Sequence, residues 1–177
     1  MEGLHIREIY SAQVKTYKEF LREGLVTDEA HFRISPDDDR NEGFPTRDVN
    51  DSFTLGAFIS DELAGVVSFE RDGRHREKLR HKGILFRMYV AAKFRKKGLS
   101  LHLIEALISR VKAIPDIEQI NLTVISANDT ARHIYTRLGF ERFAQEKNAI
   151  KWKGIYFDEE QYVLMLNGRK WEPDRSK

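Results

Sequence analysis

The stretch GILFRMYVAAKFRKKGLSLHLIEAL (83–107) places a strand, a basic turn with one glycine and a helix in direct succession. Large apolar and β-favouring residues up to Ala92 predict a central strand. A further strand is predicted over 117–126, so residues 83–126 are expected to form a parallel strand–helix–strand crossover. The helix between the two strands has its apolar residues on one face, at Ile104, Leu107, Ile108 and Val111.

The segments on either side extend this unit into a larger sheet. Upstream, the sequence predicts a strand at 4–9, a helix at 11–25 capped by Ser11, an acidic loop at 35–51, and a hairpin within 51–73 whose two runs flank Asp61-Glu62. Downstream, it predicts a helix at 128–140 and two strands within 141–166 around a turn near Lys153-Gly154. The expected fold is a mixed α/β (α+β) sheet in a single domain, 1–177, with an ordered core at 4–167 and a tail at 168–177.

Composition excludes several classes of protein. The chain has 177 residues with 30 basic and 28 acidic side chains, and this balance does not favour a large nucleic-acid-binding face. The absence of cysteine excludes a thiol nucleophile, a thiolate metal site and disulfides. No apolar run is long enough to cross a bilayer, and MEGLHIREIYSAQ (1–13) does not have the pattern of a signal peptide. We therefore expect a cytoplasmic protein that requires no metal and binds neither nucleic acid nor membrane.

The glycine turn at 95–101 has the features of an anion site. The first N–H groups of a helix are unpaired and partly positive, and phosphate is their natural ligand. Glycine permits close backbone approach, and four cations surround it, namely Lys93, Arg95, Lys96 and Lys97. Neither GxGxxG nor GxxxxGK[ST] is present, so a dinucleotide fingerprint and a Walker A loop are excluded. The simpler alternative is a solvated basic turn in which the glycine only makes the bend.

A second group of residues lies in NDTARHIYTRLGF (128–140). Asn128, Ala131, Tyr135 and Leu138 share one helix face, with Asn128 as the cap and Gly139-Phe140 as the C-terminal stop. Small Ala131 leaves room for a ligand between the amide and the phenol. The alternative is that Tyr135 belongs to the core and Asn128 is only a cap.

Together, RMYVAAKFRKKGLS (87–100) and INLTVISANDTARHIYTRLGF (120–140) resemble the GCN5-related N-acetyltransferase (GNAT) superfamily in order and spacing. The resemblance is close over 83–140. It implies a mixed, mostly antiparallel sheet of six or seven strands, with helices on both faces and a splayed central strand pair. It also implies an N-acetyltransferase that moves the acetyl group of acetyl-CoA to a primary amine by direct attack in a ternary complex. One departure is Ser100, where the family has glycine or alanine.

The resemblance implies a role for each matching residue. The backbone amides of the turn would bind the pyrophosphate of acetyl-CoA, at Arg95, Lys96, Lys97, Gly98, Leu99, Ser100 and Leu101. The pantetheine arm would lie along Met88, Tyr89 and Val90, with the N–H of Met88 facing the thioester carbonyl. Tyr135 would act as a general acid toward the CoA thiolate, and Asn128 would bind the pantetheine amides or hold the loop. Ser100 could bind phosphate or cap the helix.

A second departure from the family concerns the residue that would act as the general base. Many of them carry a glutamate on the central strand where this chain has Ile84. The candidates elsewhere are Glu70, His75, Glu77 and His81, each acting through water, and of these we retain Glu70 and His81. The alternative is that these residues belong to a solvated charged connection around RHREKLRHK (74–82).

Two further features on the expected acceptor side have alternative interpretations. Arg87, unusual in an apolar strand, would pair with a structural acid or face a substrate carboxylate. Residues Asp37, Asp38 and Asp39 would suit a cationic amine or belong to a solvated loop.

Two other functions compete with acetyl transfer. A non-catalytic acyl-CoA-binding or sensing module is favoured by Ile84 and opposed by Tyr135. A nucleic-acid-binding protein is opposed by the near-zero net charge. The acceptor is expected to be a small-molecule or peptide amine, and homodimers occur often in the superfamily.

Overall fold

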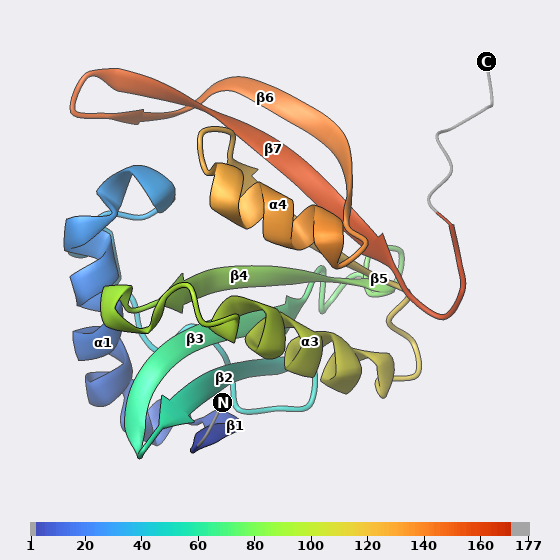
Figure 1. The fold of residues 1–177 in the computed structure, drawn as a ribbon. Coiled ribbons are helices and arrows are strands. Elements are labelled where there is room, and N and C mark those ends of the chain that lie inside the picture. The colour runs from blue at the N-terminus through green and yellow to red at the C-terminus, as the bar shows by residue number, and fades with distance from the viewer. Residues whose placement is uncertain (1–2, 171–177) are drawn as a thin grey trace.

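A computed structural model describes residues 3–170 as a seven-stranded sheet with the strand order β1-β2-β3-β4-β5-β7-β6 (Figure 1). The strands are β1 Leu4–Ile9, β2 Ser52–Ile59, β3 Glu62–Arg71, β4 Lys82–Val90, β5 Gln119–Ile125, β6 Glu141–Trp152 and β7 Ile155–Met165. The α-helices are α1 Val14–Thr27, α2 Pro36–Asn41, α3 Leu99–Lys112 and α4 Asp129–Arg137, with 3₁₀ turns at Ser11–Gln13, Glu29–His31 and Ala92–Phe94. Beyond Lys170, the predicted tail lies outside the described residues.

Every neighbouring strand pair is antiparallel except β4 and β5, which are parallel. Their register consists of three pairs at the start of both strands, Lys82–Gln119, Gly83–Ile120 and Ile84–Asn121. Beyond Ile84 the two strands no longer pair, so the sheet is split between a β1–β4 half and a β5–β7 half. The predicted mixed, mostly antiparallel sheet with a splayed central pair is confirmed.

Helices cover both faces of the sheet. Successive residues of β4 point to opposite faces, so neighbouring side chains of this strand meet different helices. The ring of Tyr89 packs against Gly24 of α1, where an added Cβ would lie 2.5 Å from the ring. Val90 lies on the opposite face, where it and Leu103 of α3 close over Gly65 of β3. We call the two faces the α1 face and the α3 face. The apolar core includes residues from both.

Several local predictions are confirmed. Asn128 caps α4 by accepting a hydrogen bond from the N–H of Ala131 at 3.1 Å. The N–H groups of Phe140 and Gly139 donate to the carbonyls of Tyr135 and Thr136, which is the Schellman pattern. The turn at Lys153-Gly154 has positive φ at both residues, as a two-residue hairpin requires.

Other local predictions are wrong. Ser11 does not cap α1, whose N-cap is Gln13; the backbone N–H of Ser11 donates instead to Asp48. The first hairpin turns at Ser60-Asp61, one residue earlier than expected. The acidic loop contains the helix α2, because Ser35 and Asp38 form a reciprocal capping box and Pro36 occupies the first turn.

Candidate functional site

A β-bulge in β4 lies beside the split in the sheet. Val66 of β3 pairs with Tyr89 and Ser68 pairs with Phe86, so two residues of β4, Arg87 and Met88, lie opposite Val67 alone. Arg87 has a φ of +50°, which is unusual for a residue with a side chain. The register gives Met88 no partner in either neighbouring strand. The bulge therefore leaves backbone at Met88 outside the ladder, at the mouth of the split.

The turn before α3 exposes a row of backbone N–H groups. Lys96 and Gly98 both have positive φ, +61° and +73°, and Gly98 is the N-cap of the 14-residue helix α3. Within residues 3–170, the N–H groups from Lys96 to Leu101 donate to no carbonyl or side chain. Successive free amides in such a turn form a concave anion site, which the helix dipole reinforces. Ser100 lies inside the helix and is not its cap.

The cations around this turn are not equivalent. Arg95 is held in place because its Nε donates to the Val90 carbonyl at 3.0 Å and its guanidinium pairs with Asp28. The hydrogen bond from Arg95 lowers the pKa of Asp28. Lys93 pairs with Glu62. Among the described residues, Lys96 and Lys97 have no acidic partner, so these two are the cations available to an anion.

Tyr135 is a buried phenol whose hydroxyl is unpaired. Its side chain is 6% exposed and packs edge-on against Phe140, with ring centroids 5.7 Å apart. The hydroxyl makes no hydrogen bond within residues 3–170, and burial raises the pKa of Tyr135 well above its ordinary value. A neutral phenol with a free O–H can donate to an anion, and it is poorly suited to act as a phenolate.

The predicted base candidates lie near the start of β4. Ile84 is exposed, and the register places Glu70 beside it on β3 and Asn121 beside it on β5. Arg47 holds Glu70, donating from Nε at 3.1 Å. His81 is half-buried, and its carbonyl accepts from the N–H of Glu118.

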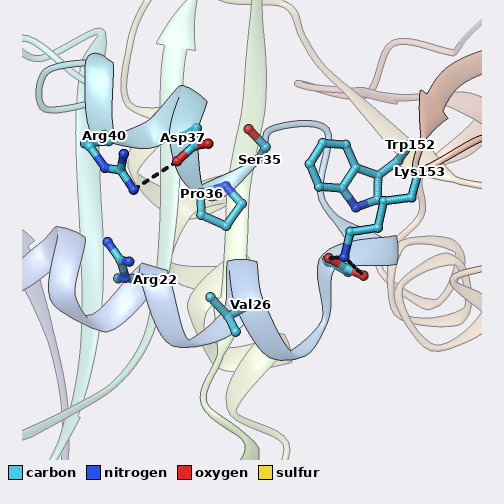
Figure 2. Close-up of a pocket in the computed structure, with 9 residues that line it drawn as sticks. Arg22, Val26, Ser35, Pro36, Asp37, Arg40, Trp152 and Lys153 are labelled. Carbon is cyan, nitrogen blue, oxygen red and sulfur yellow. Dashed lines mark hydrogen bonds and ion pairs between the residues drawn. The ribbon is translucent and has the colours of Figure 1, made fainter.

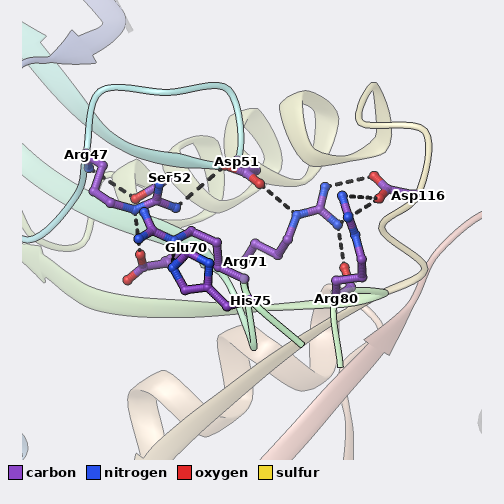
Figure 3. A network of polar contacts seen from close by, with 9 residues as sticks. Arg47, Asp51, Ser52, Glu70, Arg71, His75, Arg80 and Asp116 are labelled. Carbon is purple, nitrogen blue, oxygen red and sulfur yellow. Dashed lines mark hydrogen bonds and ion pairs between the residues drawn. The ribbon is translucent and has the colours of Figure 1, made fainter. Parts of the chain in front are cut away.

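Figure 3 shows that Glu70 belongs to a wider polar network at this end of β3. At its centre, buried Arg71 donates to Asp51 and to Asp116, each at 2.7 Å. Arg80 also pairs with Asp116. His75 accepts from Arg74, and the neighbouring Glu77 is exposed. The network ties the loop before β2 to the segment before β5, so its evident role is structural.

Arg87 pairs with structural acids, which confirms one of its two predicted roles. Its guanidinium donates to Asp39 at 2.7 Å and to Glu42. Asp39 is only 4% exposed and pairs with Arg87, so it is not available to an amine in this structure, whereas Asp37 and Asp38 are exposed. Burial beside this group raises the pKa of Tyr17 to about 12.

Sequence reasoning missed a buried carboxylate on β7. Glu159 is 2% exposed, and Arg33, from the segment between α1 and α2, places its Nε 2.7 Å from Oε1. The neighbouring Glu160 points to the other face, where it binds Arg132 of α4 and Tyr162. The only sequence signal was a run of three acidic residues inside the strand YFDEEQYVLM.

A pocket of about 440 Å³ opens between α1, α2 and the β6–β7 turn (Figure 2). Trp152, Pro36 and Val26 give it apolar walls, and Lys153 closes one side by pairing with Glu29 at 2.8 Å. The remaining lining residues are polar or charged, namely Arg22, Ser35, Asp37 and Arg40. None of these residues belongs to the set predicted for the cofactor, so the pocket is a separate recess.

Comparison with known proteins gives a consistent result. The model of the acetyltransferase (GNAT) family matches residues 8–140. One similar solved structure is an acetyltransferase of the GNAT family from Streptococcus pneumoniae, with 22% sequence identity and a TM-score of 0.79 over 92% of this chain and 99% of that one. Another is a probable acetyltransferase from Staphylococcus epidermidis, with 25% sequence identity and a TM-score of 0.74 over 93% of this chain and 99% of that one. A third, a putative acetyltransferase from Salmonella typhimurium with its cofactor acetyl-CoA, has 20% identity and a TM-score of 0.78 over 98% of this chain and 99% of that one. In the part of the chain that is described, we find no helix capable of crossing a bilayer and no cluster of three metal-ligating side chains.

Proposed function

Because this chain belongs to the acetyltransferase (GNAT) family and is an enzyme of that class, we propose that it transfers acetyl from acetyl-CoA to a primary amine by direct attack in a ternary complex. The acceptor is a small-molecule or peptide amine. One domain carries the whole site, and the protein acts in the cytoplasm, alone or as a homodimer.

One observation carries this proposal. The turn with free N–H groups at 96–101 and the unpaired backbone of Met88 lie at the two ends of the segment that leads from β4 into α3. An extended ligand with a phosphate group at one end and a carbonyl at the other fits that arrangement. Acetyl-CoA has this shape, and the similar protein from Salmonella was solved with it.

The cofactor contacts follow from this placement. The backbone from Arg95 to Leu101 would bind the pyrophosphate, with Lys96 and Lys97 neutralising its charge. The pantetheine arm would run in the split beside Met88, Tyr89 and Val90, facing Asn128 on α4. Because β5 diverges after Ile84, no protein strand competes for this edge of β4.

The chemistry requires two charge-stabilising groups. As the amine attacks, negative charge develops on the thioester oxygen, and the N–H of Met88 donates to it. When the C–S bond breaks, the thiolate needs a hydrogen bond or a proton, and the unpaired O–H of Tyr135 supplies it. Burial raises the pKa of Tyr135, so a full proton transfer to a thiol of pKa about 8.5 is uphill unless the thiolate is desolvated as well. Tyr135 therefore acts mainly as a hydrogen-bond donor in the transition state.

The two candidate bases predicted from the sequence, Glu70 and His81, have limited access to the attacking amine. Glu70 lies beside Ile84, where relatives carry their glutamate, but it would have to leave Arg47 to accept a proton. His81 lies just before β4, near the end of the split at which β4 and β5 are still paired. Both would act through water.

A thermal melt with acetyl-CoA and then with CoA tests the proposal first. A ligand at 100 times its dissociation constant adds about 2.7 kcal/mol of stability, which gives a clear rise in Tm. Release of CoA in the presence of primary amines then measures transfer. No shift with either ligand would refute the proposal. A shift without transfer to any amine would favour a non-catalytic acyl-CoA-sensing module instead.

A further inference from the structure

Glu159 is a buried carboxylate with one described partner. Its side chain is 2% exposed, and the Nε of Arg33 lies 2.7 Å from its Oε1, while the side chain of Arg33 is itself 63% exposed. Glu160, the adjacent buried glutamate, accepts hydrogen bonds from Arg132, Arg142 and Tyr162. A buried carboxylate held by one largely exposed guanidinium is stabilised less than Glu160, so its retention calls for a further explanation.

The strand register places Glu159 level with Tyr89, the residue after Met88, across the split. Ile84 pairs with both Glu70 and Asn121, and Tyr89 pairs with Val66, four residues from Glu70 along β3, because the bulge adds one residue to β4. Ile125 lies four residues after Asn121 and pairs with Glu159 of β7. Glu159 therefore lies on the far wall of the split, one step from the height of Met88, where the thioester carbonyl is expected.

A second observation links the two walls on the α1 face. Phe32 packs against Tyr89, the residue after Met88, with ring centroids 5.8 Å apart. The next residue, Arg33, reaches Glu159. Two adjacent residues of one segment thus touch both walls, and Glu159 faces the side opposite the helix that carries Tyr135.

We infer that Glu159 binds the ammonium group of the acceptor amine and takes its proton, at the position where the guanidinium of Arg33 now lies. This inference rests on the proposed function and adds to it a base and a substrate class, amines that are cationic at neutral pH. Arg33 acts as an exchangeable counter-ion, since most of its side chain is in solvent.

Each proton that leaves the amine has a stated acceptor in this mechanism. The ammonium gives one proton to Glu159, which passes it to solvent, and the free amine forms a C–N bond to the thioester carbon. The nitrogen then loses a second proton, the C–S bond breaks, and the sulfur leaves with the electron pair. The thiolate, stabilised by a hydrogen bond from the O–H of Tyr135, accepts this second proton from the nitrogen through water. The net result is one amide, one thiol and one proton released.

The electrostatic surroundings of Glu159 support this role. The charged groups that face it are Arg33 from the α1–α2 segment and Glu146, its register partner on β6. Burial, aided by Glu146, raises the pKa of Glu159 despite Arg33. A carboxylate with a raised pKa is a better proton acceptor from an ammonium than an exposed one.

The test compares Glu159→Gln with Glu70→Gln, its rival, and with Glu141→Gln, an exposed glutamate of the same hairpin, as the control. The acceptor probes are lysine amide, a tripeptide with a free N-terminus, and spermidine. We expect Glu159→Gln to keep the full Tm shift with acetyl-CoA and to lose at least about 100-fold in kcat/KM. The acidic limb of the wild-type pH profile should disappear in this variant, while Glu141→Gln behaves as wild type.

A second measurement needs no acceptor. The raised pKa of Glu159 means that its unfavourable burial appears as pH rises above the ordinary glutamate value of about 4.5. Glutamine does not ionise, so Glu159→Gln should melt higher than wild type at pH 7, with the gap closing as pH falls. A lower Tm at pH 7 would make Glu159 a structural partner of Arg33 and overturn the inference.

The remaining outcomes separate this inference from the proposed function. Normal turnover by Glu159→Gln, loss in Glu70→Gln alone, or acetylation of none of the three amines by a wild-type protein that binds acetyl-CoA would each refute the role of Glu159. Failure of the wild-type protein to bind acetyl-CoA would refute the proposed function itself.

Discussion

The two walls of the split differ in how their sites are built. The β4–α3 wall presents backbone, namely the free amides of 96–101 and the unpaired Met88, and its geometry depends on local turns and one bulge. The β7 wall and the α1–α2 segment present side chains, and their positions depend on ion pairs between residues far apart in the chain, such as Arg33 with Glu159 and Arg87 with Asp39.

This difference corresponds to the two substrates expected of the family. A ligand that is the same for every member can be bound by backbone groups, which change little when side chains vary. An acceptor that differs among members has to be selected by side chains. Substitutions on the β7 wall should therefore alter acceptor use and leave acetyl-CoA binding intact, and substitutions in the turn should do the reverse.

The largest expected effect is that of Tyr135→Phe. It removes the hydroxyl without changing the ring that packs on Phe140, so acetyl-CoA affinity should be kept. We expect kcat to fall by roughly 10²–10⁴-fold, as for loss of a general acid. Steady-state kinetics with the best amine, together with acetyl-CoA titration by calorimetry, would measure both quantities. Unchanged kcat would remove Tyr135 from the mechanism.

Asp39→Ala tests how far the acceptor side depends on ion pairs. Loss of one partner from a buried pair costs about 3–5 kcal/mol, and since Glu42 still holds Arg87 we expect about 2 kcal/mol. Urea unfolding would measure the change, with exposed Asp37→Ala as the control. If Asp39→Ala also weakened acetyl-CoA binding, the two walls would not be independent.

Gly98→Val tests the backbone site directly. A side chain at φ +73° costs about 1–2 kcal/mol and projects into the space that the phosphate would occupy. The matched control is Gly154→Val, at φ +83° in the β6–β7 turn, where the strain is similar and no cofactor is expected. Both variants should lose Tm, but only Gly98→Val should bind acetyl-CoA at least about tenfold more weakly, a loss of about 1.4 kcal/mol. Equal affinities in the two variants would contradict the anion site.

The smallest expected effect is that of Arg33→Gln. If the guanidinium competes with the acceptor for Glu159, its removal should lower KM for cationic amines a few-fold, in line with the modest strength of exposed ion pairs. Affinity for acetyl-CoA should not change. A raised KM would show instead that Arg33 contributes to acceptor binding.

The sequence allowed prediction of the turn before α3 and of the helix α4 because their signals are local. The glycine, the cap at Asn128 and the stop at Gly139-Phe140 each act within a few residues, and the structure forms them as expected. The parallel crossover also followed, since a strand, a helix and a strand in succession leave few topologies open.

The β7 wall, the α1–α2 segment and the bulge in β4 could not be predicted in the same way. Asp39 and Arg87 are 48 residues apart, and Arg33 and Glu159 are farther still, so no periodicity links them. The bulge at Arg87 was hidden because one extra residue in a strand leaves no mark in an apolar run. The helix α2 was not predicted because three consecutive aspartates favour a loop by composition, although Ser35-Pro36 before them is typical of a helix start.

Because β4 and β5 pair over only three residue pairs, the two halves of the sheet are nearly separate and emerge one after the other during translation. Residues up to Lys112 include β1–β4 and the free amides before α3, and each of these strands pairs with its neighbour in sequence. Everything on the far wall comes later, from Asn128 and Tyr135 to Glu159. A nascent chain that ends before β7 therefore holds the proposed cofactor half of the site without Glu159, so under this proposal the two substrates can meet only on a chain that has been translated through β7.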